Sequence, residues 1–245
     1  MARPIRVLVN AHDVVEWLSE NGPATPAELA VRLDMPRSSV YRLVDGLTSI
    51  SLTRTDADGR VHVGERWLRL ADAAQASMTE WSGMREVLVR LAKHTGQTAF
   101  LSVPQPDGAL CIDWSQGRGI DVLALKPGRS LPFNAGAAGR IAFAYADESA
   151  QAEAASQPLR SFTPQTITTI ERLMADAARV REAGWVHSDE DVTLGIGSVG
   201  IPVLGQDNAL IGCASLAGLA GEIRELRDVL VAQLRAGVAS WSSKR

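Results

Sequence analysis

The chain has few of the residues that mark several common classes of protein. Its 245 residues include two cysteines and four histidines, and aromatic residues make up 5% of the sequence. Cys111 and Cys213 lie in apolar stretches, which favours reduced core positions over a disulfide framework or a metal site. The histidines are scattered and lack the spacing of metal ligands. We therefore expect no metal ion.

Long apolar runs are also missing, and we expect no N-terminal leader. No run approaches the roughly 20 apolar residues that a membrane-spanning helix requires, and the first residues turn polar after a short apolar patch. Hydrophobic residues still make up 46% of the chain, which is enough to bury a core. These features predict a cytoplasmic protein that has no membrane partner.

Neither sign of charge dominates the chain. The formal net charge is −3, and 22 of the 25 basic residues are arginine. A net charge of this size gives no whole-protein argument for nucleic-acid binding, so such a function would depend on a local surface. Arginine can bind phosphate or carboxylate through two parallel hydrogen bonds, but the same bias can also reflect genome composition.

The first 65 residues have the pattern of three short helices followed by a hairpin. Apolar residues recur at helical spacing over residues 5–20. Thr25 and Glu28 have the spacing of a capping box that opens a second helix, and a third helix follows after a short break. Two short strands then flank the turn residues Asp58 and Gly59. This order predicts a winged helix-turn-helix.

The outward face of the third helix favours DNA binding. Serine and arginine near a helix N-terminus suit contacts with phosphates and base edges in a major groove. An ordinary solvated helix with a capping serine would explain the same residues without DNA. Residues 1–66 carry eight arginines and nine acidic residues, so we expect weak non-specific affinity and a need for dimerisation. The candidate DNA-binding residues are Arg3, Arg6, Thr25, Arg37, Ser38, Ser39, Tyr41, Arg42 and Arg60.

Residues 65–95 have a helical pattern that weakens at Ser82-Gly83. The first half carries an apolar stripe that includes Trp67, Leu68 and Leu70. Two consecutive core helices would explain this pattern, but the winged helix-turn-helix (the head) is too small to cover the stripe. We therefore favour a linker helix that pairs with its copy in a second subunit. The predicted domains are a winged helix-turn-helix over residues 1–64, a linker helix over 65–82 and an effector-binding domain over 83–245.

The remaining residues alternate between strand and helix patterns, which predicts an α/β (α+β) fold with an antiparallel sheet. Strands are expected at residues 97–104, 109–115 and 120–126 and in a hairpin after Gly200, with a loop and then a helix from about Ala135. An amphipathic helix ends at Gly184, and Thr168 is its expected N-cap.

Residues 195–200, GIGSVG, match the dinucleotide fingerprint G-x-G-x-x-G. The fingerprint requires its glycines to end a strand and open a helix, whose N-terminus holds the pyrophosphate. Here a hairpin follows, with Pro202 two residues on. We therefore expect no cofactor, and we assign these glycines to close approach of another element or of a small ligand.

Three segments in this order resemble the IclR family of transcriptional regulators: residues 23–47, 131–145 and 183–218. The resemblance implies a winged helix-turn-helix head, a linker helix and a GAF-like effector domain. It also implies dimers or tetramers on palindromic double-stranded operator DNA and a small organic acid as effector. Carried over by position, the candidate effector-binding residues are Ile120, Leu131, Ala137, Ala138, Ser188, the adjacent Asp189, Ile196, Ser198 and Ser215.

The sequence departs from the family's usual pattern at several of these positions. The family often has cysteine at Ser198, aspartate at Ser188 and serine at Ala217, and Arg140 replaces the usual lysine. These changes remove polar groups that usually meet a small keto or hydroxy acid. We therefore hypothesise a less polar effector, such as an aromatic carboxylate, with Trp114 or Trp185 nearby.

The predicted function is a sequence-specific DNA-binding transcriptional regulator, expected to be a repressor, controlled by a small carboxylic acid. An enzyme is not expected, because the neighbouring residues His187, Ser188 and Asp189 point to alternate faces of one extended segment and cannot form a triad. The alternative is a GAF-like ligand-binding or protein-interaction module whose winged helix does not bind DNA.

Overall fold

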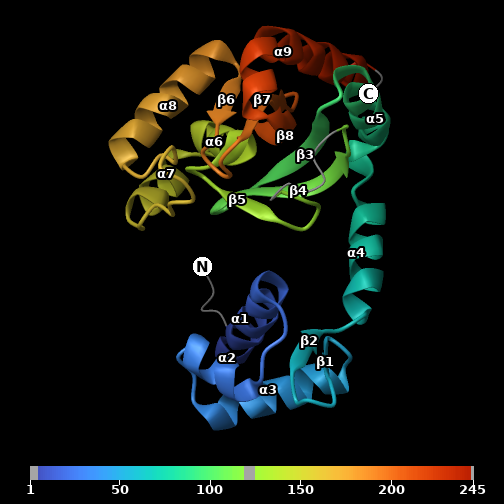
Figure 1. Cartoon of the computed structure of the whole chain (residues 1–245), viewed down its shortest axis with the longest axis vertical. Coiled ribbons are helices and arrows are strands. Elements are labelled where there is room, and N and C mark those ends of the chain that lie inside the picture. The colour runs from blue at the N-terminus through green and yellow to red at the C-terminus, as the bar shows by residue number, and fades with distance from the viewer. Residues whose placement is uncertain (1–4, 119–124, 244–245) are drawn as a thin grey trace. The chain divides into compact units, whose positions relative to one another are not determined.

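The computed structural model describes residues 5–118 and 125–243. The chain divides into two compact units, Met1–Thr79 and Glu80–Arg245, each with its own hydrophobic core (Figure 1). The predicted linker helix is grouped with the first unit by its contacts. The domain boundaries predicted at residues 64 and 82 remain predictions.

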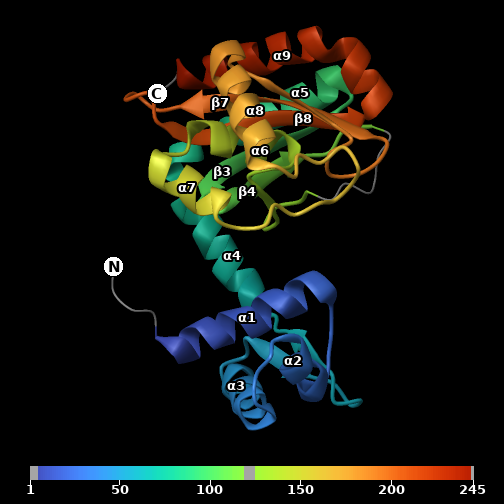
Figure 2. The same ribbon diagram turned by 90° about the vertical axis from the view of Figure 1, so that its left-hand side faces the viewer.

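The first unit has the element order of a winged helix-turn-helix, as the sequence predicts (Figure 2). Its helix α2 (Pro26–Arg32) begins at a full capping box, in which the Thr25 hydroxyl accepts the Glu28 N–H at 3.3 Å and the Glu28 carboxylate accepts the Thr25 N–H at 2.8 Å. Val14, Leu29 and Val40 are fully buried in the core of this unit. The elements are α1 (Arg6–Asn21), α2 (Pro26–Arg32), α3 (Arg37–Ser49), β1 (Thr53–Thr55), β2 (Val61–Val63) and α4 (Arg66–Ser77).

The helix α4 is attached to the hairpin end of the head, and its apolar stripe faces solvent. Its Arg66 donates to the Ile50 carbonyl at 2.8 Å, and the Trp67 indole donates to the Leu52 carbonyl at 2.9 Å. Leu68 is 73% exposed. A 3-10 turn, η1 (Thr79–Trp81), and the left-handed Gly83 interrupt the helical run, which confirms the predicted weak point.

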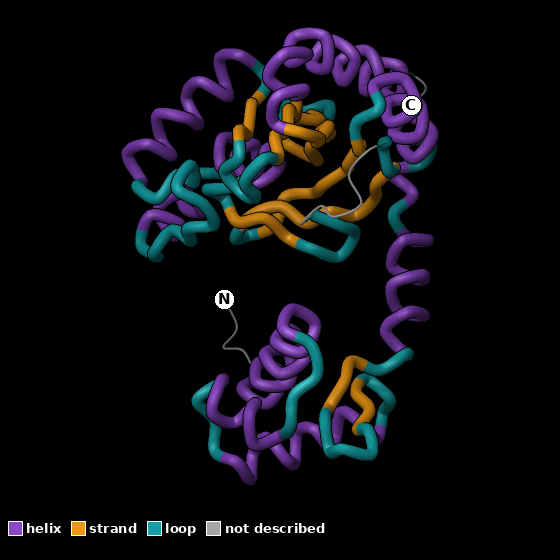
Figure 3. Tube along the Cα trace, viewed as in Figure 1, coloured by secondary structure: helices purple, strands orange, loops and turns teal. Residues whose placement is uncertain are grey.

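The second unit is built on a six-stranded antiparallel sheet in the order β5-β4-β3-β8-β7-β6 (Figure 3). Its strands are β3 (Thr98–Gln105), β4 (Gly108–Ser115), β5 (Ser130–Pro132), β6 (Val186–Asp189), β7 (Ile196–Leu204) and β8 (Leu210–Leu219). Its helices are α5 (Met84–Thr95), α6 (Gly136–Tyr145), α7 (Glu148–Ala155), α8 (Ile170–Ala183) and α9 (Ala220–Ser242).

Helices cover the two faces of this sheet, with α5 and α9 on one face and α6, backed by α8, on the other. Two glycines of β7 allow this close packing. A Cβ at Gly197 would lie 3.3 Å from the Cβ of Ile223 in α9, and one at Gly200 would lie 2.9 Å from the Cβ of Ala137 in α6. The GIGSVG segment therefore belongs mainly to strand β7. Gly197 and Gly200 have no side chain, which allows α9 and α6 to pack closely against the strand.

Two expectations within this unit are wrong. The described part of the predicted third strand, Leu125 and Lys126, is not in a strand, while residues 119–124 lie outside the described residues. β4 pairs with β3 on one side and with β5 on the other, and β5 lies in the segment expected to be a loop. The N-cap of α8 is Thr169 rather than Thr168, because the Thr169 hydroxyl accepts the Arg172 N–H at 3.4 Å.

Among the described residues, no helix is both long and apolar enough to cross a membrane.

Candidate functional site

The outward face of α3 presents polar and basic side chains on one side of the helix. Arg37, Ser38, Tyr41 and Arg42 are all exposed, and their spacing places them on a common face. Ser39 is half-buried. The N-cap of α3 is Pro36, which makes no side-chain hydrogen bond, so the serines of the first turn do not cap the helix. The serines of this face therefore do not cap α3, and an ordinary solvated helix stays the alternative to a DNA-binding face.

The arginines of this face are available to an external anion. Within the described part of the chain, Arg37 and Arg42 form no ion pair. Arg42, Arg6 and Ser39 line a concavity between the start of α1 and the turn that precedes α3. Asp13 and Asp34 line the same concavity, which moderates its positive charge.

Two other candidates of the head are engaged within the head itself. The Thr25 hydroxyl belongs to the capping box of α2. Arg60 donates to the Pro23 carbonyl at 2.9 Å and lies 3.7 Å from the Glu28 carboxylate. The hydrogen bonds from Thr25, followed by the charge of Arg60, lower the pKa of Glu28. These contacts stabilise the wing and α2, whatever further role the two side chains have. Arg3 lies outside the described residues.

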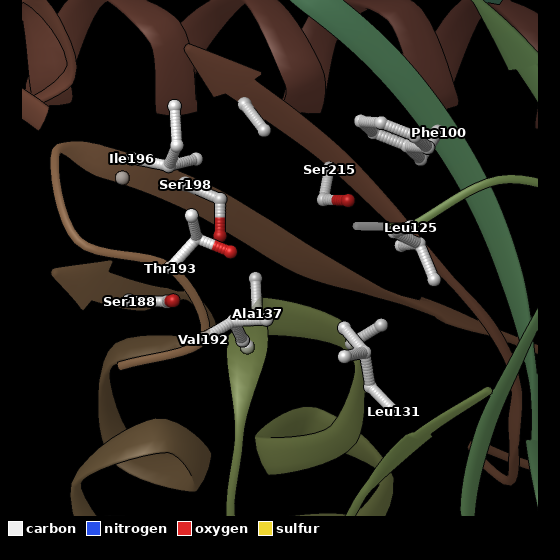
Figure 4. Close-up of a pocket in the computed structure, with 14 residues that line it drawn as sticks. Phe100, Leu125, Leu131, Ala137, Ser188, Val192, Thr193, Ile196, Ser198 and Ser215 are labelled. Carbon is white, nitrogen blue, oxygen red and sulfur yellow. The ribbon is translucent and has the colours of Figure 1, made fainter. Parts of the chain in front are cut away.

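A pocket opens between the face of the sheet that α6 covers, the start of α6 and the loop that follows β6 (Figure 4). It encloses about 480 Å³ of space that no protein atom fills, its open mouth included. The residues that line it are Phe100, Leu125, Leu131, Gly136, Ala137, Ala138, Ser188, Val192, Thr193, Ile196, Gly197, Ser198, Ser215 and Ala217.

Most of the effector-binding residues predicted from the sequence meet at this pocket. Ser198 pairs with Ala217, and Ser215 pairs with Gly200, so both serines lie on the face of the sheet that α6 covers. Ile120 lies outside the described residues. The predicted residues that line the pocket are Leu131, Ala137, Ala138, Ser188, Ile196, Ser198 and Ser215.

Asp189 and Trp185 do not line the pocket. Side chains alternate along β6, so Asp189 points away from the face that carries Ser188, and its carboxylate accepts from Arg224 at 3.0 Å. Trp185 lies against the Arg227 guanidinium, 5.4 Å from ring centroid to carbon. Trp114 is close to the pocket without lining it, because its ring packs 6.0 Å from that of the lining residue Phe100.

Other lining residues were missed by reasoning from the sequence. Phe100 pairs with Ser215 across β3 and β8, so the period-two pattern would have indicated it once the strand order was known. Val192 and Thr193 lie in a loop and carry no comparable signal. Also missed were Leu125 and Gly136. Gly197 and Ala217, which the sequence already connects with a ligand, line the pocket as well.

No charged side chain lines the described part of the pocket, so any anion there must be bound by neutral groups. Ala137 and Ala138 lie in the first turn of α6, where backbone N–H groups lack an acceptor within the helix. The helix dipole favours a negative charge at that position. Ser188, Thr193, Ser198 and Ser215 add hydroxyl groups. The pocket therefore combines neutral hydrogen-bonding groups with apolar walls.

A buried ion network lies behind the pocket. Arg140 donates to both carboxylate oxygens of Asp176 at 2.7 Å and to Asp191 at 3.1 Å. Burial of the guanidinium opposes its charge, but the carboxylates of Asp176 and Asp191 outweigh this effect and raise the pKa of Arg140. Asp191 also accepts the Gly136 N–H at 3.2 Å and the hydroxyl of Ser188. The network thus connects the α6 N-terminus, α8 and the wall of the pocket.

A winged helix-turn-helix joined to an α/β unit with its own pocket defines the class of ligand-responsive DNA-binding regulators. The IclR helix-turn-helix domain family matches residues 7–57, and the bacterial transcriptional regulator IclR C-terminal family matches residues 76–243. The chain therefore belongs to the IclR family and is a DNA-binding transcriptional regulator. These families are regulators and not enzymes, which confirms the expectation of a non-enzymatic function.

Individual relatives agree with this assignment. The chain is 21% identical to the HTH-type transcriptional repressor AllR of Escherichia coli, over 90% of this chain and 83% of AllR. It is 25% identical to an IclR transcriptional regulator of known structure from Alicyclobacillus acidocaldarius, with a TM-score of 0.81 over 98% of this chain and 99% of the other. An IclR homologue from Microbacterium hydrocarbonoxydans, solved in complex with 4-hydroxybenzoate, shares the fold at 20% identity, with a TM-score of 0.69 over 96% and 99% of the two chains.

Proposed function

We propose that the protein is a repressor that binds a palindromic operator as a homo-oligomer and is controlled by a small carboxylic acid, which we take to be aromatic. The observation that carries this proposal is the pocket of the second unit, where the N-terminus of α6 meets hydroxyl groups and apolar walls.

The pocket walls favour a ring over a short aliphatic acid. Phe100, Leu131 and Ile196 supply apolar surface, and Trp114 backs Phe100. The carboxylate of the acid would bind the N–H groups of Ala137 and Ala138, where the helix dipole compensates its charge. The complex of the Microbacterium homologue with 4-hydroxybenzoate adds support, since that protein has the same fold.

The proposal of a homo-oligomer depends on the exposed apolar stripe of α4. Trp67, Leu68 and Leu70 are 36%, 73% and 44% exposed. A second copy of α4 would bury this surface and pair two heads, and two paired heads require two half-sites on the operator. Repression is supported by the relative AllR, a repressor. In this scheme the effector lowers operator affinity because it binds the DNA-free arrangement of the oligomer more tightly.

The test combines two measurements on the full-length protein. A thermal-shift screen against aliphatic and aromatic carboxylic acids should identify an aromatic hit, since a ligand at 100 times its dissociation constant adds about 2.7 kcal/mol of stability. Footprinting on the protein's own promoter region should then show a protected palindrome that the hit releases. If no aromatic acid raises the unfolding temperature, the proposal of an aromatic effector is wrong. If the hit strengthens DNA binding, the proposed release of the operator by the effector is wrong.

The second candidate is a protein-interaction module whose winged helix does not bind DNA. It is favoured by the acidic residues Asp13 and Asp34 beside Arg42. Direct DNA binding separates the two candidates, because a specific regulator prefers its operator to random duplex by roughly 10³-fold or more. An equal affinity for both duplexes would favour the second candidate.

A further inference from the structure

We infer that Asp191 fixes the hydroxyl of Ser188 as a hydrogen-bond acceptor, so that the effector must present a hydrogen-bond donor at this end of the pocket. The inference rests on the proposed function and narrows its ligand class to organic acids that carry a hydroxyl or amino group. Asp191 acts through Ser188 and is therefore a positioning residue, and Ser188 is the residue that would touch the ligand.

The direction of the hydrogen bond between these two side chains follows from the ion network. Both residues are 3% exposed, and the Ser188 hydroxyl lies within hydrogen-bond distance of Asp191 Oδ1. Asp191 Oδ2 is 3.1 Å from the guanidinium of Arg140, and Oδ1 also accepts the Gly136 N–H. A carboxylate that faces a guanidinium, which is always protonated, is ionised and can only accept. The single hydroxyl proton of Ser188 must therefore go to Asp191.

Ser188 consequently offers only its lone pairs to the pocket, whereas the other hydroxyls are not committed. In the described part of the chain, the side chains of Thr193, Ser198 and Ser215 have no hydrogen-bond partner. In Figure 4 the hydroxyl ends of Thr193 and Ser198 are turned toward each other, and that of Ser215 points toward Leu125. These hydroxyls can donate to a carboxylate, as can the N–H groups at the start of α6.

The pocket thus distinguishes donors from acceptors at one defined position. A phenol, alcohol or amine can donate to Ser188 and leave no buried group unpaired. A methoxy group of similar shape has no proton to donate, so its oxygen would face the lone pairs of Ser188. Leaving a buried acceptor unpaired in this way weakens binding by about tenfold or more.

The test measures ligand selectivity by calorimetry on the full-length protein. The probes are benzoate and its 3-hydroxy, 4-hydroxy, 3-methoxy and 4-methoxy derivatives. At least one hydroxybenzoate should bind about tenfold more tightly than its methoxy counterpart. Ser188→Ala should reduce this ratio to near one. Asp191→Asn should also reduce it, because an amide at this position can donate to Ser188 and free the serine proton for the ligand.

Ser198→Ala is the matched control, since it removes a hydroxyl of the same pocket that Asp191 does not hold. It should lower the affinity for all five acids alike and preserve the ratio. Should Asp191→Asn fail to fold, the pair Ser188→Ala and Ser198→Ala still decides the question. The inference is wrong if hydroxy and methoxy acids bind equally well, or if the ratio of their affinities is unchanged in Ser188→Ala. Either result would still be compatible with an aromatic effector. Absence of binding by all five acids would remove the proposed aromatic effector and this inference with it.

Discussion

The two units of the protein use arginine in opposite ways. On α3 of the head, Arg37 and Arg42 are exposed and form no ion pair within the described residues. In the second unit, Arg140 is 8% exposed and contacts two aspartates and the His187 carbonyl. The first arrangement leaves charge available to an external phosphate, and the second uses charge to hold buried elements together.

This difference explains why a chain with a net charge of −3 can bind DNA. The charge that matters is the charge that no internal partner has neutralised. An arginine that is buried and paired adds to the count of basic residues but contributes little to the field outside the protein. Four predictions test this contrast between the two units, in order of expected effect.

The largest effect is expected from Arg140→Ala. The substitution leaves Asp176 and Asp191 as buried carboxylates with much of their compensation lost, so the second unit should lose about 3–5 kcal/mol of unfolding free energy. Arg179→Ala is the matched control, because Arg179 also binds Asp176 but is 74% exposed. Its loss should lower stability by about 1 kcal/mol or less. Chemical denaturation measures both, and equal losses would show that burial does not separate the two pairs.

Arg42→Ala should reverse the pattern, with a loss of DNA affinity and little change in stability. If Arg42 reads a base, operator binding should weaken by about 1–3 kcal/mol and sequence preference should relax. Arg90→Ala, at an exposed arginine of α5 in the second unit, removes the same charge and should leave operator affinity unchanged. Electrophoretic mobility shifts at fixed salt give both affinities. Unaltered operator affinity of the Arg42→Ala variant would show that Arg42 does not contribute to DNA binding.

Thr25→Ala separates a structural role from a DNA contact. Loss of the capping box should lower the stability of the head by about 1 kcal/mol. Thr25→Ser keeps a hydroxyl that can cap α2 and should restore most of that stability. Operator affinity should follow stability if Thr25 acts only through the helix. An affinity that falls with the alanine variant under conditions where the head is fully folded would instead show a direct contact with DNA.

The smallest effect concerns pH and the second unit. Burial lowers the pKa of His187, whose Nε2 is buried without a hydrogen-bond partner in the described structure. The folded state therefore binds a proton less readily than the unfolded state, whose ordinary pKa is about 6.5. This contribution to stability is complete above that value and declines as the pH falls toward the lowered pKa.

His187→Gln should remove that part of the acid sensitivity. The difference should be about half a kcal/mol or less, because the side chain is partly exposed and water screens it. Urea unfolding of the variant and the wild type at pH 7.5 and pH 5.5 gives the comparison, with exposed His94→Gln as the matched control. A larger acid sensitivity in the His187→Gln protein would contradict the direction of the shift.

Local patterns predicted the head better than they predicted the second unit. Helical spacing, the Thr25–Glu28 box and the Asp58-Gly59 turn act over a few residues, and each is present in the structure. The strand β5 was missed, because the three-residue segment after Pro127 and Gly128 was expected to be a loop. Pairing with β4 selects Ser130–Pro132, and that choice depends on the path of the chain rather than on composition.

The amino-acid sequence by itself determined the order of the elements in the winged helix-turn-helix, the family and half of the residues that line the pocket, because these follow from local spacing and from matched motifs. The tertiary structure alone decided how the polar groups are paired. Asp189 and Asp191 are two residues apart in sequence, yet one accepts from Arg224 at the surface and the other is buried against Arg140. Partners such as Arg140 and Asp176 come from distant segments, so only the packing of α6, α8 and the loop after β6 brings them together.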